Sequence, residues 1–428
     1  MSKQLGIHVL GPKLGEAVVV ELPDNGVGVI DSFASGAHGR HPVIDFLRRE
    51  YPALTELRFL AVTHPHADHC FRCADLYDEL PPREVWLFKP FPLGQLHDYY
   101  KALRDLGTSD DVEAALGLPA GSVGLSLLQL DDRVVKRIVN RQLPYRPLIC
   151  NQSFTLCGGT VKVHFLTPGN RQQIRYQNQV NTVLKSITED GRTITDLASR
   201  GPDHNLASTG ILIEYGRARA FLLADAVNDL WDEWFESSPV TTNWRPVQFI
   251  KAAHHGSVNG HHSRLYSEIA DPKATIAVVT PFKQGNVHLP ETLGIQALQP
   301  TVKEVYCTNR TSATASTSMT WNAVRQRPLP SIPHDWMKRI ARAPTLGMLL
   351  DPRALASAPS GGRTPALPAD WIGDATKNRD LWHLIRPEYR HPVPGLVPAH
   401  DYAVSAFLDK KGNVKEVRVG YEAGKLES

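Results

Sequence analysis

The chain has 428 residues, of which 42% are hydrophobic and 21% charged, and its formal net charge is +3. This composition is typical of a globular protein and excludes a largely disordered chain. The nearly balanced charge argues against a protein that holds nucleic acid by bulk charge alone, although it leaves room for a local basic patch. The five cysteines are odd in number and widely spread, which excludes a simple disulfide framework.

The sequence gives no sign of export or of membrane insertion. The first residues, MSKQLGIHVLGP, contain neither a long apolar core nor a cleavage pattern. The apolar runs, such as residues 17–20 and 221–224, are far too short to span a bilayer. We therefore expect a cytoplasmic protein with no membrane partner.

The predicted elements alternate between strands and helices along most of the chain. Near the start, strands are predicted over residues 5–10, 17–22, 27–30, 57–63 and 84–88, with helices over 41–50 and 71–79. The same rhythm returns later, with strands over residues 210–215, 218–223, 247–251, 275–280 and 300–307. Short buried strands interleaved with helices predict a layered α/β fold.

Two stretches depart from this rhythm. Residues 93–200 are interpreted as an insertion near the active-site face, with helices over 98–106, 110–116 and 131–140, a strand over 161–165 and a mobile loop over 172–181. Residues 326–428 are interpreted as a Pro/Ala-rich extension that ends in a β-hairpin over 402–419. The main domain is accordingly predicted to span residues 1–325.

The clearest chemical signal is the segment HPHADH, which directly follows a predicted buried strand. Imidazole and carboxylate groups are ligands that zinc and similar metal ions prefer. Because alternate residues of a tight turn face the same side, His64 and His66 are placed to bind one ion, and Asp68 and His69 a second. The alternative is a solvent-exposed histidine-rich loop, which the apolar strand before it and the spacing disfavour.

This H-x-H-x-D-H motif resembles the signature of the metallo-β-lactamase superfamily, and later residues fit the order of that signature. These residues, each beside a predicted strand, are Asp31, His204, Asp225 and the pair His254-His255. The match is incomplete, since the usual Gly-His-Thr is absent around His204 and alanine precedes Asp225 where glycine is usual. Taken singly, His204 could be a solvated loop residue and Asp225 a helix cap. The resemblance implies an αββα sandwich.

The same resemblance implies a dinuclear metal centre. One ion would be bound by His64, His66 and His204 and the other by Asp68, His69 and His255, with Asp225 as the bridge. His254 competes with His255, which is preferred because it stands immediately before a glycine. Asp31 would orient a ligand histidine or shape its turn. The expected cofactors are two divalent ions, zinc first and manganese as the alternative, with a metal-bound hydroxide as nucleophile.

A narrower resemblance points to the C-terminal hydrolase domain of ComEC-type DNA-uptake channels and their stand-alone relatives. It is carried by residues 11–22, by HPHADH, LLADA and KAAHHGS, and by VHLP and VYCT nearer the end of the matching region. The chain departs from that pattern at His66, where ComEC-type sequences commonly carry aspartate, and it shows no channel segment. The resemblance leaves out the insertion and the extension.

Together these features predict a metal-dependent hydrolase, and first a phosphodiesterase or nuclease acting on DNA or a nucleotide. Asp68 and His288 are the expected catalytic residues, although His288 fits a surface loop equally well. Lys251 and Ser257 are expected to contact the substrate. Further candidates for phosphate contact are Arg264, Lys283 and Arg310, although solvated surface is the preferred interpretation for most of these basic residues.

Two alternatives stay open from the sequence. One is a hydrolase of a small ester, a lactone or a cyclic nucleotide, which would use the same metal centre. The other is a catalytically inactive binding or scaffold protein that has kept the fold. The complete set of expected ligands disfavours the second alternative.

Overall fold

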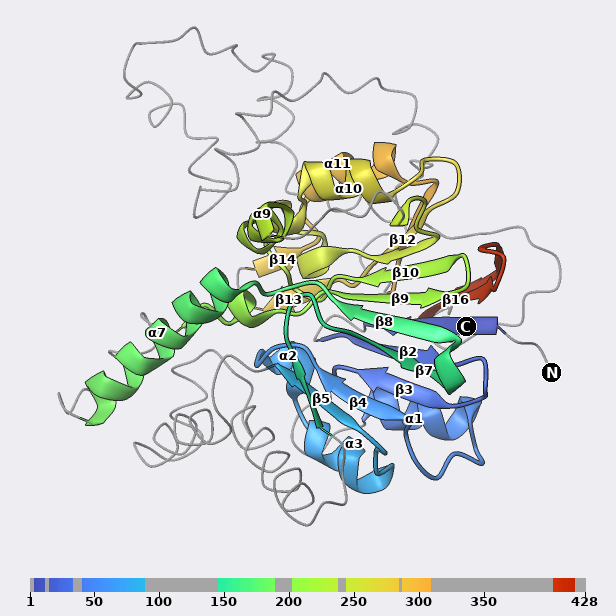
Figure 1. Ribbon diagram of the computed structural model, residues 1–428, viewed down its shortest axis with the longest axis horizontal. Coiled ribbons are helices and arrows are strands. Elements are labelled where there is room, and N and C mark those ends of the chain that lie inside the picture. The colour runs from blue at the N-terminus through green and yellow to red at the C-terminus, as the bar shows by residue number, and fades with distance from the viewer. Residues whose placement is uncertain are drawn as a thin grey trace, which may run out of the picture.

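Two large β-sheets lie face to face, and helices cover the outer surface of each sheet (Figure 1). The computed structural model describes residues 4–11, 15–33, 41–88, 145–188, 202–237, 244–284, 287–308 and 403–419. In Figure 1, helices α1 (Pro42–Glu50) and α3 (Cys73–Glu79) lie on one outer face, and α9 (Asn228–Ser237), α10 (Ser263–Ile269) and α11 (Thr292–Leu298) on the other. This order of layers confirms the predicted αββα sandwich.

The first sheet has eight strands in the order β17-β16-β1-β2-β3-β4-β5-β6. Their bounds are β1 (Gln4–Leu10), β2 (Ala17–Glu21), β3 (Val27–Ile30), β4 (Phe59–Val62), β5 (Val85–Phe88), β6 (Tyr145–Leu148), β16 (Ala403–Asp409) and β17 (Val414–Val419). Pairing is antiparallel from β17 to β3 and parallel from β3 to β6. Every residue of β3, β4 and β5 is buried, as expected for parallel strands covered on both faces.

The second sheet has seven strands in the order β15-β12-β11-β10-β9-β8-β7. Their bounds are β7 (Ser153–Leu156), β8 (Val161–Phe165), β9 (Ile211–Tyr215), β10 (Ala218–Leu222), β11 (Phe249–Lys251), β12 (Ile276–Val279) and β15 (Glu304–Cys307). A separate two-stranded ribbon is formed by β13 (Phe282–Gln284) and β14 (Val287–Leu289). The predicted strands of both sheets are therefore present, with small shifts at their ends.

Aromatic side chains join the two sheets at the centre of the sandwich. Trp86 of β5 stacks on Phe59 of β4 with ring centroids 3.8 Å apart. The same indole meets Phe154 of β7 and Phe165 of β8 edge-on, at 5.0 and 5.8 Å. Large apolar rings contribute most to such a core because each removes much surface from water. The core thus fixes how the strand ends of one sheet face those of the other.

The expected insertion over residues 93–200 is partly an integral piece of the sandwich, because β6, β7 and β8 lie within this range and belong to the two sheets. The mobile loop predicted over residues 172–181 is wrong, since these residues lie in helix α7 (Asn170–Thr188). Tyr176, Val180 and Val183 are buried at helical spacing along α7. The helices predicted over residues 98–140 lie outside the described residues.

The predicted C-terminal hairpin is present as β16 and β17, and it continues the first sheet. Strand β16 pairs with β1 over the full length of both strands, from Gln4 opposite Asp409 to Leu10 opposite Ala403. Four residues of β16 are fully or almost fully buried in the core, which ties the end of the chain to its beginning. Within the described part of the chain, no helix is both long and apolar enough to cross a membrane.

Candidate metal centre

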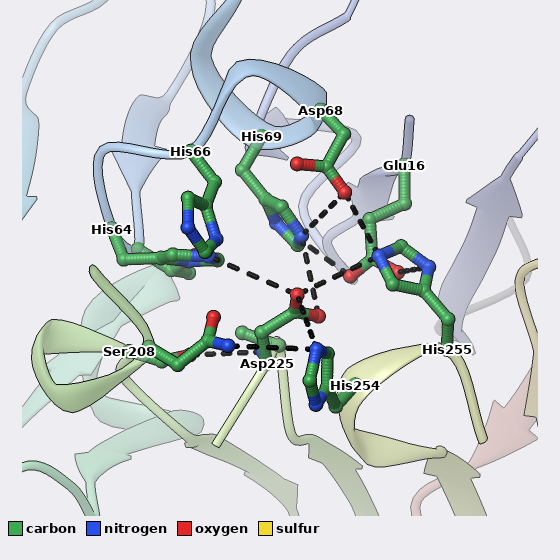
Figure 2. Close-up of polar contacts among 12 residues, drawn as sticks. Glu16, His64, His66, Asp68, His69, Ser208, Asp225, His254 and His255 are labelled. Atoms are coloured by element: carbon green, nitrogen blue, oxygen red, sulfur yellow. Dashed lines mark hydrogen bonds and ion pairs between the residues drawn. The ribbon is translucent and has the colours of Figure 1, made fainter. Parts of the chain in front are cut away.

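The candidate ligands come together at one end of the sandwich, where strands of both sheets end (Figure 2). The HPHADH turn follows β4, and its second half forms the short helix α2 (Ala67–Cys70). Asp225 follows β10, and the pair His254-His255 lies in the 3₁₀ turn η4 (Ala253–Gly256) directly after β11. Because β10 and β11 are parallel neighbours, their ends deliver these residues to the same edge.

The Asp225 carboxylate lies among four imidazole rings. Its Oδ2 is 3.9 Å from His64 Nε2, 3.9 Å from His254 Nε2 and 3.5 Å from His255 Nε2. Its Oδ1 is 3.3 Å from His69 Nε2. In each case the Nε2 atom, and not Nδ1, is the one that faces the carboxylate.

Potential ligand atoms form two groups, and Asp225 belongs to both. One group joins Asp225 with His64 and His66; the other joins it with Glu16, His69 and His255, and within each group the atoms lie within 4.8 Å of one another. His69 Nε2 and Asp225 Oδ1 are buried and make no hydrogen bond within the described part of the chain. Buried polar atoms left unsatisfied in this way are costly, and a cation between them would satisfy both. Nitrogen and oxygen donors at this spacing fit a divalent metal ion.

The imidazole rings are held from behind through their Nδ1 atoms. This arrangement fixes the ring orientation and directs Nε2 toward the centre, as in known metal sites. The Nδ1 partners are Thr63 Oγ1 for His64 (3.1 Å), Asp31 Oδ2 for His69 (2.8 Å), Tyr176 Oη for His204 (2.7 Å), Asn259 Oδ1 for His254 (2.7 Å) and the Thr280 carbonyl for His255 (3.0 Å). His66 differs, since its Nδ1 lies 3.1 Å from His64 Nε2.

Charge separates the two sides of the centre. Burial disfavours the ionised forms of Asp68 and Asp225, but neighbouring histidines outweigh it, lowering the pKa of Asp68 to about 2 and holding that of Asp225 well below its usual range. Burial also opposes the charged form of His69, yet the carboxylates around it raise its pKa well above the usual value. At His64 and His204 burial dominates and lowers the pKa well below the usual value. One side is therefore rich in carboxylate charge and the other in neutral imidazole.

The backbone at the centre adopts a conformation that non-glycine residues rarely take. Asp31, Ala224, His254 and His255 have φ angles of 64°, 43°, 45° and 53°. Left-handed backbone of this kind costs free energy and tends to gather at functional sites. This conformation turns the backbone sharply just after a strand, so that the side chains there point toward the centre.

His204 and His254 need separate comment. The His204 ring lies 5.3 Å from that of His66, yet His204 is in neither of the two groups of ligand atoms. His254 and His255 both point toward Asp225, so the structure does not set one of them aside as the sequence did. The His254 side chain is 18% exposed and that of His255 1%, which makes His254 the more accessible ring.

Several predicted substrate contacts are not supported by the structure. Lys251 is a correction: its side chain is 1% exposed and pairs with Glu16, so it points into the protein. Ser257 is also buried, and its hydroxyl donates to Asn259 and Glu291, bracing its own loop. His288 lies exposed on β14 and its catalytic role stays a prediction.

The remaining basic candidates differ in their surroundings. Arg264 pairs with Glu268 and lies over the Phe235 ring, 4.1 Å from its centroid, so its guanidinium group is already engaged. Lys283 is exposed on β13 opposite His288. Arg310 lies outside the described residues. Of the two described residues, Lys283 keeps a place from which a phosphate contact can be argued.

The sequence analysis missed one residue at the centre, Glu16. It stands just before β2, its side chain is 2% exposed, and it lies near the Nδ1 atoms of His69 and His255. The one available signal was a carboxylate directly before the apolar run of residues 17–20. The residues that hold Nδ1 atoms, such as Tyr176 and Thr280, were missed too, because each lies far along the chain from the histidine it contacts.

No protein-family model matches the chain, and no curated protein sequence matches it. Solved structures similar to it include the metallo-β-lactamase fold protein YhfI from Bacillus subtilis, with 11% identity, a TM-score of 0.36, and coverage of 71% of this chain and 96% of that one. Yeast PDE1 is similar with 11% identity, a TM-score of 0.38, and coverage of 71% and 97%. The Rm3 metallo-β-lactamase has 14% identity, a TM-score of 0.30, and coverage of 57% and 74%. At these values the fold and the site rest on this chain's own strands and side chains.

Proposed function

We propose that the chain is a metal-dependent hydrolase with a dinuclear centre, and that its substrate is a phosphodiester. The observation that carries the proposal is the position of Asp225, whose carboxylate is shared by two groups of ligand atoms and faced by four Nε2 atoms. An anionic group among nitrogen donors that are already oriented is what two neighbouring divalent cations require. His64 and His66 would hold one ion, and Asp68, His69 and His255 the other, with Asp225 between them.

The ions expected are zinc or manganese, which when bound supply the positive charge that activates a water and stabilises negative charge developing on the substrate. Asp68 carries its negative charge at neutral pH because neighbouring histidines outweigh burial and lower its pKa to about 2, which suits the carboxylate to binding a cation. Its Oδ2 lies 2.9 Å from His255 Nε2, which fixes the carboxylate at the edge of the centre. His254, the more exposed of the two adjacent rings, is placed to contact an incoming substrate.

The phosphodiester assignment is supported by the order of motifs that resembles ComEC-type hydrolase domains and by the suitability of two ions for in-line displacement at phosphorus. One observation favours a second candidate, a hydrolase of a small ester or cyclic nucleotide. With Lys251 turned inward and Arg264 engaged elsewhere, two of the expected contacts to a polymer backbone are lost. Whether the substrate is a polymer or a small molecule therefore has to be decided by assay.

The test uses purified protein loaded with zinc or manganese. Its substrates are single- and double-stranded DNA, RNA, and bis(p-nitrophenyl) phosphate. Cleavage of polymer and of the small diester supports a nuclease, whereas cleavage of the small diester alone favours the second candidate. Asp225→Asn should abolish either activity, while Glu214→Gln, which alters a carboxylate bound to His164 away from the centre, should leave it unchanged. No turnover with either metal on any of these substrates would contradict the proposal.

A further inference from the structure

A buried ion pair lies directly behind the candidate metal centre. It joins Glu16, which precedes β2 of the first sheet, to Lys251, the last residue of β11 in the second sheet. Their side chains are 2% and 1% exposed. A lysine this deeply buried is costly unless it is paired, so its presence at the centre calls for a role.

Glu16 reaches the two histidines on the carboxylate-rich side of the centre (Figure 2). Its Oε1 lies 3.7 Å from His69 Nδ1 and its Oε2 lies 3.4 Å from His255 Nδ1. Both contacts are made to Nδ1, whereas Nε2 is the ring atom that faces Asp225. Glu16 therefore approaches both rings at Nδ1, and its carboxylate also belongs to the group of potential ligand atoms around Asp225.

The Glu16 oxygens are already engaged by other donors. Lys251 pairs with Oε1, and the Thr280 hydroxyl donates to Oε2. The main chain adds a further tie, since Glu16 N–H donates to the Asp68 carbonyl at 2.9 Å. Donors on both oxygens hold this carboxylate in place, which suits it to orienting the neighbouring rings.

Lys251 extends the connection to the Asp225 turn. Its Nζ donates to the Ala224 carbonyl at 3.0 Å, and the same carbonyl accepts from His254 N–H at 2.9 Å. Ala224 has a φ of 43° and directly precedes Asp225. The ammonium group therefore links Glu16 to the sharp turn that presents the shared carboxylate.

We propose that Glu16 and Lys251 form a positioning pair that holds the Nδ1 faces of His69 and His255 and the Asp225 turn in one fixed arrangement. The proposal rests on the proposed function, because the rings are positioned for metal ions. The pair bridges the two sheets at the point where both contribute ligands. Losing either member should loosen the His69 ring of the first sheet relative to His255 and Asp225 of the second sheet.

The test compares Glu16→Gln, Lys251→Met and the double variant with the wild type and with the Glu214→Gln control. Zinc affinity is measured by competition with a chelator, and ligand geometry by the visible absorption of the cobalt-loaded protein. Groups that orient metal ligands typically contribute 10–100-fold to affinity, so each single variant should bind zinc about 10–100-fold more weakly with an altered cobalt spectrum. Because one pair is removed twice, the double variant should lose less than the product of the two single effects.

Three results would overturn the proposal. Wild-type zinc affinity in Lys251→Met with a loss in Glu16→Gln alone would make Glu16 a direct ligand. Fully multiplicative losses would show that the two residues act independently. Since a lone buried charge can unfold a single variant, the double variant, which buries neither charge, keeps the test decisive. Wild-type zinc affinity and cobalt spectrum in the folded double variant would refute the positioning role.

Failure of the proposed function would look different. If the wild type itself takes up neither zinc nor cobalt, the hydrolase proposal fails, and the pair is then judged on the metal-free protein by thermal unfolding. The pairing is supported if the melting temperature of the double variant falls by less than the sum of the two single-variant decreases. Strictly additive losses in melting temperature contradict it.

Discussion

Asp31→Asn should disable one half of the centre while leaving the fold in place. The Asp31 carboxylate accepts three hydrogen bonds, from Thr63 N–H and Thr63 Oγ1–H at 2.7 Å each and from His69 Nδ1–H at 2.8 Å. Two of them, from the Thr63 hydroxyl and from His69, share the same oxygen, Oδ2. The residue has a φ of 64°, a conformation that asparagine accepts almost as readily as aspartate. The backbone turn is therefore expected to survive the substitution.

The effect arises from the tautomer of His69. In the variant, the amide oxygen keeps the bond from Thr63 N–H, so the amide NH₂ replaces Oδ2 and faces Nδ1. An NH₂ group can only donate, so Nδ1 must become the acceptor and the neutral ring keeps its proton on Nε2. That proton then points at Asp225 and occupies the lone pair that an ion would use. Altered orienting groups of this kind cost 10–100-fold in metal affinity, or about 1.4–2.7 kcal/mol.

The assay is zinc competition with a chelator, with far-UV circular dichroism and thermal unfolding as controls for folding. Glu214→Gln is the matched variant, because it places the same amide against another histidine, His164, remote from the centre. We expect weaker zinc binding in Asp31→Asn alone, with unchanged secondary structure. Zinc affinity within twofold of the wild type in a folded Asp31→Asn protein would refute the tautomer argument.

Three further predictions concern the centre, acid stability and the chain end. Asp68→Ala should lower turnover by about 100-fold or more and reduce metal content while sparing circular dichroism, whereas a mere helix cap would lower the melting temperature and spare turnover. His261 stacks on Tyr266, and burial together with His262 lowers its pKa to about 4. Because the unfolded chain takes up the proton first, the free energy of unfolding should fall by about 3 kcal/mol as pH drops from 6.5 toward 4. His261→Phe should flatten this pH dependence, measured by urea titration. Removal of residues 403–428 should expose the edge of β1 and lower the free energy of unfolding by on the order of 5 kcal/mol. The loss would be measured as aggregation or a lower melting temperature. A soluble protein with an unchanged melting temperature would contradict the pairing of β16 with β1.

The sequence predicted the part of the site whose residues are neighbours in the chain or mark strand ends. HPHADH carries its ligands within six positions after an apolar strand, and that spacing survives whatever packs around it. Asp225 and His254-His255 were predicted from the resemblance of the motif order to the metallo-β-lactamase signature, and the structure brings them together because β10 and β11 are parallel neighbours. Most strands of both sheets were predicted from short apolar runs, whereas β6 and β7 were not predicted.

The rest depends on contacts between distant segments. Lys251 looked like a phosphate contact because it lies beside a candidate site loop, and its burial follows only once Glu16 is known to face it. Residues 172–181 looked like a loop because they are rich in glutamine and asparagine. The helical spacing of the buried residues Tyr176 and Val180 was a weaker signal in the sequence than this polar composition. Neither error could be corrected from local sequence.

The central claim is that Asp225 is shared by two metal ions, and anomalous X-ray diffraction from crystals of the zinc-loaded protein tests it most directly. Data collected on either side of the zinc absorption edge would locate each ion independently of the protein atoms. The account predicts two peaks about 3.5–4 Å apart on either side of the Asp225 carboxylate, one beside His64 and His66 and the other beside His69 and His255. A single peak, or peaks remote from Asp225, would contradict it.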